Sequence, residues 1–511
     1  MSTWKTLRAL VAGSLVILGH RGFPAGPAKA WSQDPDASSD TTTPIKHLVV
    51  IIQENCSFDH YFGTYPHAAN PPGEPPFHAR PGTPTVNGLS PALMNQNPNL
   101  NNPFRLDRSH AVTGGNSNDM LKEQSAIDGG LMDKFVQFTG THDAGFFPSD
   151  VMGYFDGNTV TAWWNYAQHF SMSDNFFATT CGATILGHIN IVSGQTHGAM
   201  GNGPDPLNLK DSSGNWLIYQ GTLVANTNSA LDHWATKKQR FQLTGKNVGD
   251  LLRAKGVTWG YFSGGFQNKA STHPGTDGVP TMDYGINREP FQLYASTANP
   301  DHLPPASAAE IGHDGVANHQ YDLNDFQTAI VNHSIPAVTF LKAPNFETGH
   351  PGLDSTPLEE QTFLVNTLNQ LQKLPEWRQM AVLITYDDSD GWYDHQMPPI
   401  VNHSMSPLDA LLGPGNSGAN AMGGYPARCG YGPRLPLLVV SPFSKENYVD
   451  HGIADQSSIL RFIEDNWSLG RIGDFSFDAK AGSLLGHFEF RHGPRERKLF
   501  LDPSTGVRME E

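Results

Sequence analysis

The feature that most constrains the fold is an apolar run at residues 48–52, which ends abruptly before Glu54 and Asn55. An unbroken aliphatic run of this length is typical of a strand buried on both faces of a parallel sheet. Open α/β sheets place their chemistry at the carboxyl ends of such strands. The run therefore predicts a central strand that delivers Glu54 and Asn55 as ligands; the alternative is that both residues only cap a helix beginning near Ser57.

A second run, residues 381–385, has the same form and leads into two adjacent carboxylates, Asp387 and Asp388. Such carboxylates repel each other unless a cation or a shared proton compensates them, and a hard metal ion is the simplest compensation. A calcium-binding loop is excluded because Tyr386 occupies its first ligand position and its terminal acid is absent. A solvated acidic turn is the alternative. The predicted ligands of one divalent metal ion, of unknown identity, are Glu54, Asn55, Asp387 and Asp388.

The candidate nucleophile is Thr184, which follows Gly182 and stands at or near the start of an expected short helix. A hydroxyl beside a metal ion and a helix N-terminus loses its proton more easily, and the same helix end attracts a phosphate group. These properties predict phosphoryl transfer through a phosphothreonine intermediate. The alternative for Thr184 is an ordinary helix cap.

Further strands and helices alternate along the chain and predict an α/β fold with a doubly wound central sheet and helices on both faces. Catalytic-domain residues should run from 44 to 507. Three polar insertions, near residues 64–118, 197–240 and 263–325, are expected to form a smaller lid region. The other expected strands are 257–262, 336–341 and 435–440, and the expected helices include 123–138, 160–169, 248–255, 457–467 and one entered through a capping box at Thr356 and Glu359.

The N-terminus predicts export. Lys5 and Arg8 precede an apolar segment at residues 9–19, and Ala28-Lys29-Ala30 is a small-x-small cleavage site, so residues 1–30 are expected to be a signal peptide. An uncleaved anchor is the alternative. Residues 31–43 should be a disordered linker, and the mature chain, periplasmic or secreted, should lack a transmembrane span. The formal charge of −16 disfavours nucleic acid as a partner.

Five ordered blocks of sequence resemble the bacterial phosphoesterase family that joins the acid phosphatase A group to phospholipases C and is related to the alkaline phosphatase superfamily. The resemblance covers roughly residues 43–507. Residues 159–167 and 386–391 are closest to the acid phosphatase branch. The blocks are 54–63, 175–184, 349–352, 386–395 and 432–436.

The resemblance implies an alkaline-phosphatase-like sheet and gives the candidate residues roles. The four predicted ligands match residues around the metal and phosphate, Thr184 matches the nucleophile, and His350 matches a histidine that reaches the phosphoryl group, where it binds an oxygen or protonates the leaving group. The implied activity is an exported, metal-dependent acid phosphatase acting on small phosphate monoesters. The alternatives are a phospholipase C-type phosphodiesterase acting on phospholipid head groups and a catalytically silent ligand-binding member.

Two departures from the family pattern leave the general acid open. Asn118 stands where relatives usually have a histidine, and Asn287-Arg288 replaces a His-His pair. Arg288 can still clamp a phosphate through two parallel hydrogen bonds, so it joins the catalytic candidates. His110 either replaces the first missing histidine or has an ordinary surface role.

The three cysteines allow at most one intramolecular disulfide. Cys56 and Cys181 each lie in a site block, so they pair only if those blocks bring the two sulfur atoms together. Oligomeric state is left open.

Overall fold

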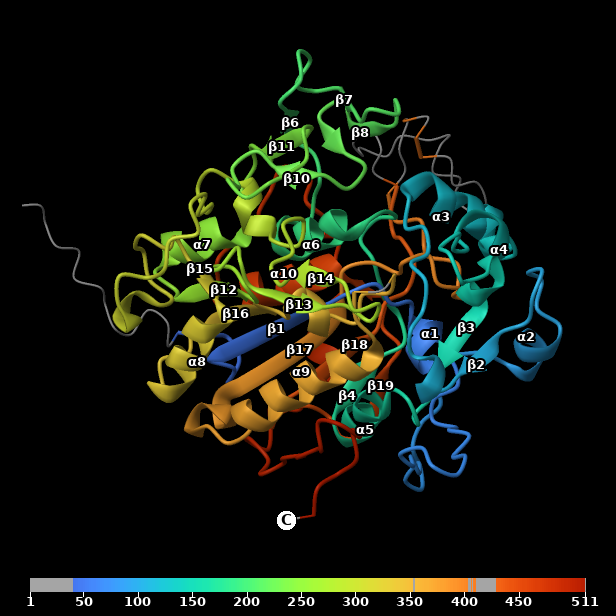
Figure 1. Cartoon of the computed structure of the whole chain (residues 1–511). Helices are drawn as coiled ribbons and strands as arrows, with labels where there is room; N and C mark the ends of the chain where they lie inside the picture. Colours follow the sequence, from blue (N-terminus) through green and yellow to red (C-terminus); the bar gives the residue numbers. More distant parts are fainter. Residues whose placement is uncertain (1–39, 353, 403–405, 407, 410–428, 511) are drawn as a thin grey trace, which may run out of the picture. The chain divides into compact units, whose positions relative to one another are not determined.

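The computed structural model describes residues 40–352, 354–402, 406, 408–409 and 429–510 (Figure 1). The expected signal peptide and residues 31–39 of the expected linker lie outside these residues. Thr42 N donates to Asn466 O over 2.8 Å, and Thr43 Oγ1 donates to Asn466 Oδ1 over 2.7 Å. Ordered structure therefore begins slightly before the expected boundary at residue 44.

The central element is an eight-stranded mixed sheet, which confirms the predicted α/β fold. Its middle strands are buried on both faces, as their apolar sequences require. Every strand runs parallel to the others except β18, which is antiparallel to both neighbours. The order across the sheet is β15 (Gln320–Asp322), β12 (Trp259–Ser263), β16 (Val338–Lys342), β1 (His47–Gln53), β17 (Met380–Tyr386), β18 (Leu437–Val440), β4 (Ser171–Ser173) and β19 (Tyr448–Asp450).

Helices cover both faces of this sheet, as predicted (Figure 1). On one face lie α5 (Thr161–His169), α8 (Leu323–Val331) and α9 (Pro357–Leu371), and Gln327 of α8 hydrogen-bonds to Gln370 of α9 over 3.1 Å. The expected capping box of Thr356 and Glu359 opens α9. On the other face, α6 packs against its neighbours α7 and α10. Their bounds are α6 (Thr184–Ser193), α7 (Val248–Lys255) and α10 (Gln456–Asn466).

Two local expectations change. The helix expected at 123–138 is two helices, α3 (Met120–Ile127) and α4 (Phe135–Phe138), because Asp128 takes a left-handed backbone with φ of 44° and two glycines follow it. The helix expected near Ser57 exists as α1 (Phe58–Phe62), and Ser57 itself is the cap. Glu54 and Asn55 are therefore not helix caps.

The insertions add small elements around the carboxyl edge of the sheet. Residues 197–240 contribute strands to two three-stranded sheets, and Arg240–Leu243 (β11) completes one of them. Apolar side chains of this region pack on Ile185 and Ile189 of α6. No helix among the described residues is both long and apolar enough to cross a bilayer. The remaining elements are α2 (Pro91–Asn95), β2 (Phe104–Leu106), β3 (Gly153–Phe155), β5 (Phe176–Phe177), β6 (Ala199–Gly201), β7 (Leu209–Lys210), β8 (Trp216–Tyr219), β9 (Thr222–Leu223), β10 (Asn228–Ser229), β11 (Arg240–Leu243), β13 (Thr272–Pro274), β14 (Pro280–Met282) and β20 (Ala454–Asp455).

Candidate active site

The two predicted ligand pairs lie side by side at the carboxyl edge of the sheet. Strands β1 and β17 are neighbours in parallel register, with Gln53 opposite Tyr386, so the residues that follow each strand meet. Asn55 N donates to Asp387 Oδ1 over 3.0 Å, and Asn55 Nδ2 donates to Asp390 Oδ1 over 2.8 Å. Asn55 reaches this position through a left-handed backbone with φ of 60°, which asparagine tolerates better than most residues.

Glu54 is buried among positively charged groups. Arg288 Nε lies 3.1 Å from Glu54 Oε2, and Lys342 Nζ, at the end of β16, contacts Glu54 Oε1. Burial alone would raise the pKa of Glu54, but Arg288 and Lys342 outweigh it and hold the pKa well below its ordinary value. Glu54 is therefore an ionised carboxylate in the interior.

The other buried acids of the site are less fully compensated: Lys342 also acts on Asp387, but it does not outweigh the effect of burial. Burial, followed by the charges of Glu54 and Asp388, raises the pKa of Asp387 well above its ordinary value. Burial, followed by the charges of Asp390 and Glu123, does the same to Asp388. Burial raises the pKa of Glu123 to about 8. This group of carboxyls therefore has a strong demand for positive charge.

Helix α6 brings Thr184 to these acids, as the sequence predicts for a hydroxyl at the start of a helix. Thr184 is the first residue of α6, and no group in the described part of the chain hydrogen-bonds to its hydroxyl. His188 lies one turn later on the same helix face, 3.3 Å from Glu54 Oε1 and 3.9 Å from Asp387 Oδ2. Thr184 and His188 thus face the ends of β1 and β17 from one helix.

A glycine makes this close approach possible. A Cβ atom at Gly187 would lie 1.8 Å from the carbonyl oxygen of Asp387, so any larger residue would push α6 away from the strand end. Gly182 has a φ of +125°, a conformation that favours glycine, and its N–H donates to Glu123 Oε2 over 2.7 Å. The turn before Thr184 is therefore tied to the acid group as well.

Arg288 and His350 lie on the same side of Glu54. Arg288 NH2 is 3.5 Å from Asp354 Oδ2, and His350 Nδ1 is 3.7 Å from the same oxygen. Burial and then the charge of Arg288 lower the pKa of His350, so its imidazole is neutral near pH 7. The structure thus gathers all seven predicted site residues around the ends of β1 and β17.

The residues at the departures from the family pattern have clear positions. Asn118 Nδ2 donates to Asp388 Oδ2 over 2.9 Å, so an amide occupies the place expected for a histidine. His110 is exposed and pairs with Asp107 at 2.9 Å, an ordinary surface role. The sequence did not single out His188 or Lys342. His188 had a usable signal, since it lies four residues after the candidate nucleophile in an expected helix.

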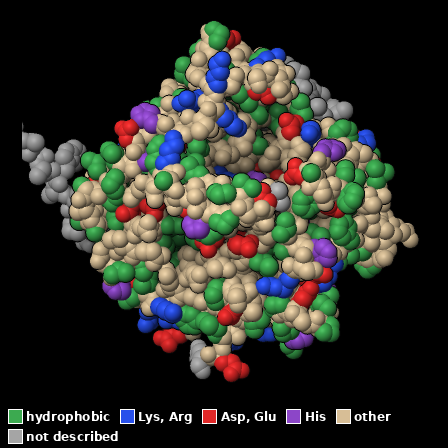
Figure 2. Space-filling model, viewed as in Figure 1, with side chains coloured by type: hydrophobic (Ala, Val, Ile, Leu, Met, Phe, Trp, Pro, Cys, Tyr) green, Lys and Arg blue, Asp and Glu red, His purple; other side chains and the backbone are tan. Residues whose placement is uncertain are grey.

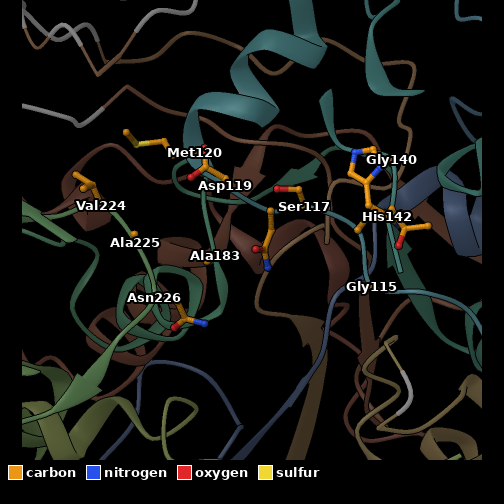
Figure 3. A pocket seen from close by; sticks show the side chains of 13 residues that line it. Gly115, Ser117, Asp119, Met120, Gly140, His142, Ala183, Val224, Ala225 and Asn226 are labelled. Carbon is orange, nitrogen blue, oxygen red and sulfur yellow. The ribbon is translucent and has the colours of Figure 1, made fainter. Parts of the chain in front are cut away.

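A cavity of about 310 Å³, lined by both polar and apolar residues, opens beside Thr184. Ala183 lines it, as does Asn118, the donor to Asp388. Figure 3 shows Val224, Ala225 and Asn226 of the 197–240 insertion on one side of this cavity and His142 on the other, with Ala183 between them. Figure 2 shows this face of the molecule hollowed beneath the same insertion, with charged side chains at the rim.

Some of these groups fit a metal ion. Glu54, His188 and Asp387 each place a ligand atom within 4.8 Å of the others. Asp387 Oδ2 and Asn55 Oδ1 are buried and have no hydrogen-bond partner among the described residues, as expected of atoms that would bind a cation. Asp388 differs, because its oxygens accept from Asn118 and from the backbone of Asp390. A set of carboxylate oxygens and one imidazole suits a divalent cation such as zinc or manganese.

The cysteines do not contribute to this site through a disulfide. Cys56 and Cys181 are free, buried thiols in different apolar clusters, and Cys56 Sγ instead donates to Ser57 O over 3.2 Å. Their pairing, left open by the sequence, does not occur in this structure.

Comparison with known proteins finds several phospholipases C among the relatives of this chain. The chain is 24% identical over 437 residues to the non-hemolytic phospholipase C of Pseudomonas aeruginosa, aligned over 83% of this chain but only 54% of that protein's length. It is 24% identical to phospholipase C A of Mycobacterium tuberculosis, over 85% of this chain and 77% of that protein. It is 22% identical to non-specific phospholipase C1 of Arabidopsis thaliana, over 89% of this chain and 72% of that protein.

A solved structure and a family model complete the comparison. A protein of the alkaline phosphatase superfamily from Vibrio parahaemolyticus matches 71% of this chain and 78% of its own, with 9% identity and a TM-score of 0.30, too low to support an argument. The model of the Phosphoesterase family matches residues 45–470, which include every residue of the site described above. The chain therefore belongs to the Phosphoesterase family.

Proposed function

We propose that this chain hydrolyses phosphodiesters of the phospholipase C type, with Thr184 as the nucleophile. The observation that carries the proposal is the placement of Thr184 at the start of α6, one turn before His188, which contacts Glu54 and lies near Asp387. This arrangement sets an unbonded hydroxyl at a positive helix end beside a buried carboxylate group.

Glu54, His188 and Asp387 would hold a divalent cation, with Asn55 beside them. When bound, such an ion lowers the pKa of a coordinated hydroxyl and neutralises charge on a phosphoryl group. Thr184 Oγ1 then forms a bond to phosphorus while the bond from phosphorus to the leaving oxygen breaks. Water subsequently cleaves the phosphothreonine, which releases the phosphorylated product and restores the threonine hydroxyl.

Arg288 and His350 would bind the phosphoryl oxygens on the side of Glu54. Arg288 keeps its charge at any working pH, so its guanidinium stabilises negative charge that develops during transfer. His350 Nδ1 lies against the carbonyl oxygen of Pro351, which makes that nitrogen the donor and leaves Nε2 as an acceptor that would take a proton from the attacking water.

The relatives described above are phospholipases C, which supports a phospholipid substrate. One feature of the site favours a second candidate, a phosphomonoesterase of the acid phosphatase type. The cavity beside Thr184 has a volume of only about 310 Å³, which suits a small phosphate monoester better than a diacylglycerol moiety. We propose further that the enzyme works after export, in the periplasm or outside the cell, because residues 1–30 have the form of a signal peptide.

One assay series tests the nucleophile and separates the substrates. Wild-type protein, Thr184→Ala and Thr184→Ser are supplied with phosphatidylcholine and with an aryl phosphate, and initial rates are measured. We expect Thr184→Ala to lose at least about a thousandfold in turnover and Thr184→Ser to retain a substantial fraction. Faster turnover of phosphatidylcholine supports the phosphodiesterase. Preference for the aryl phosphate replaces it with the monoesterase, and no turnover of either substrate by the wild type indicates a silent ligand-binding member.

A further inference from the structure

A second cavity, of about 670 Å³, lies far from the proposed active site and is lined mainly by basic side chains. We call it the basic groove. Its lining includes six lysine or arginine residues and one acid, Glu496, in a chain whose formal net charge is −16. Positive charge is therefore concentrated in this groove although the whole protein is negatively charged. The six cations are Lys373, Arg378, Arg495, Arg497, Lys498 and Arg508.

The groove lies at the amino ends of the parallel strands, opposite the catalytic edge. Residues 375–379 line part of it and directly precede β17, whose other end leads to Asp387. His169, also in the lining, precedes β4, and Pro442 follows the antiparallel β18, so both lie at the same edge. Because β17 rises about 3.3 Å per residue from Met380 toward Asp387, the groove and Asp387 are more than about 20 Å apart.

Several of the groove cations are not neutralised. Among the described residues, no carboxylate lies within ion-pair distance of Arg495, Lys498 or Arg508, and Arg378 reaches Glu496 only at 4.0 Å. Arg497 is the exception, since it pairs with Glu446 at 2.9 Å. The groove therefore presents net positive charge to solvent.

His169, which also lines the groove, responds to that positive charge. Burial, and then the charges of Arg497 and Arg80, lower the pKa of His169 to about 4, and Arg508 acts in the same direction. The imidazole is thus neutral near pH 7 and adds no further repulsion. At the floor, Trp377 is buried and its Nε1 donates to the carbonyl oxygen of Arg497 over 3.4 Å, which fixes one basic segment in place.

We propose that the basic groove binds a small, soluble anion that carries two or more phosphate groups. Four of its six cations are arginines, whose planar fork matches phosphate oxygens. They come from three separate segments of the chain, so they suit several phosphate groups rather than one. The volume lies within the range of about 300–1,000 Å³ that is typical of small-molecule sites.

A lipid membrane offers the same phosphate chemistry but is the less favoured source. This step rests on the proposed catalytic site: a planar bilayer that presents a phospholipid to Thr184 cannot at the same time contact the opposite edge of the sheet. A soluble ligand has no such restriction and can occupy the groove during turnover.

The test uses methylenebisphosphonate, because a phosphoesterase cannot hydrolyse its P–C–P bridge, and measures binding by titration calorimetry. The groove variant combines Arg495→Gln, Lys498→Gln and Arg508→Gln. A control variant removes the same charge from exposed lysines elsewhere, through Lys238→Gln, Lys246→Gln and Lys255→Gln. Circular dichroism and phosphoester turnover verify that both variants are folded.

We expect the groove variant to bind the bisphosphonate about tenfold more weakly than wild type, and the control variant and Thr184→Ala to bind as wild type does. High salt should weaken wild-type binding, since exposed charges are screened. Equal binding by the groove variant and wild type would overturn the proposal, whatever Thr184→Ala does to turnover. Binding of the wild-type protein to phosphatidylglycerol vesicles, measured by sedimentation, would also overturn the proposal if the groove variant alone lost it, because the groove would then be a membrane contact.

Discussion

Two buried acid groups in this molecule have similar ligand geometry but different environments. Glu54, His188 and Asp387 bring their ligand atoms within 4.8 Å of one another, and so do Asp59, Asp394 and His395. In the second group, Arg434 lies 3.0 Å from Asp394 and 3.1 Å from Asp59, and His395 Nδ1 is 2.6 Å from Asp59. We call the second group the arginine-centred cluster.

The difference lies in how the negative charge is compensated. Arg434 also donates to the carbonyl oxygens of Asn87 and Asp174, so its fork is fully used. Burial would raise the pKa of Asp59, but His395 and Arg434 lower it below the ordinary value. In the active site, by contrast, Asp387 Oδ2 accepts a hydrogen bond from no described residue, whereas Asp59 and Asp394 both accept from Arg434. Unmet charge, rather than ligand geometry alone, distinguishes a candidate metal site from a structural ion-pair network.

Removing the compensating charge should break the arginine-centred cluster. We expect Arg434→Met to lower the free energy of unfolding by about 3–5 kcal/mol, because it leaves the buried Asp59 and Asp394 with only His395 to compensate them. Chemical denaturation measures this loss. Lys134→Met, which breaks the exposed pair with Asp128, is the control and should leave the free energy of unfolding nearly unchanged. A similar small cost for both variants would contradict the structural role of Arg434.

The same kind of change in the active site should have the opposite effect on stability. We expect Asp387→Asn to reduce phosphoester turnover at least about a hundredfold, a loss of about 2.7 kcal/mol in transition-state stabilisation. The chelated variant should be more stable than the chelated wild type, because one repelling carboxylate is gone. Elemental analysis, initial rates and denaturation of chelated protein test these points. Full activity in the wild type after its metal is removed would reject the ligand assignment.

A third buried acid, Glu360, is compensated by protonation. Glu360 accepts hydrogen bonds from Tyr61 and Tyr386, and burial raises its pKa to about 8 despite them. Its contribution to stability is therefore present below the ordinary pKa of 4.5 and is lost as pH rises through about 8. We expect Glu360→Gln to remove this pH dependence, worth on the order of 2 kcal/mol between mildly acidic and alkaline pH. Parallel stability profiles for variant and wild type would contradict this interpretation.

The smallest effect should come from the amide that supports the active-site acids. Asn118→Ala removes the hydrogen bond to Asp388, and we expect about a tenfold loss of turnover with little change in stability. Asn118→His, which restores the residue usual in the family, should retain more activity than the alanine variant and should alter the pH dependence of the rate. Identical pH–rate profiles for Asn118→His and wild type would place the side chain outside the reaction.

The central strands and the main site residues were predictable because both follow from strong local patterns. Strands β1 and β17 are long aliphatic runs, and polar pairs directly follow them. The edge strands β15 and β19, and β4 beside β19, have three residues each, too few to show any periodicity, so tertiary pairing alone defines them.

The missed residues had weaker signals. Lys342 ends a buried strand and forms its partnership with Glu54 across the sheet, a contact that sequence spacing cannot reveal. The same limit applies to Arg434, whose motif was visible although its link to Asp59, 375 positions away in the sequence, was not.

The backbone contact between Gly187 and the Asp387 carbonyl limits how closely the proposed nucleophile, Thr184, can approach the acids. It fixes how far α6 advances toward the strand ends by backbone against backbone. The same helix also packs on the cavity wall, because Ala225 lies against the apolar cluster that contains Ile185 and Ile189. An engineer who exchanges the wall to change what enters the cavity would therefore have to keep Ala225 if the reaction centre is to stay undisturbed.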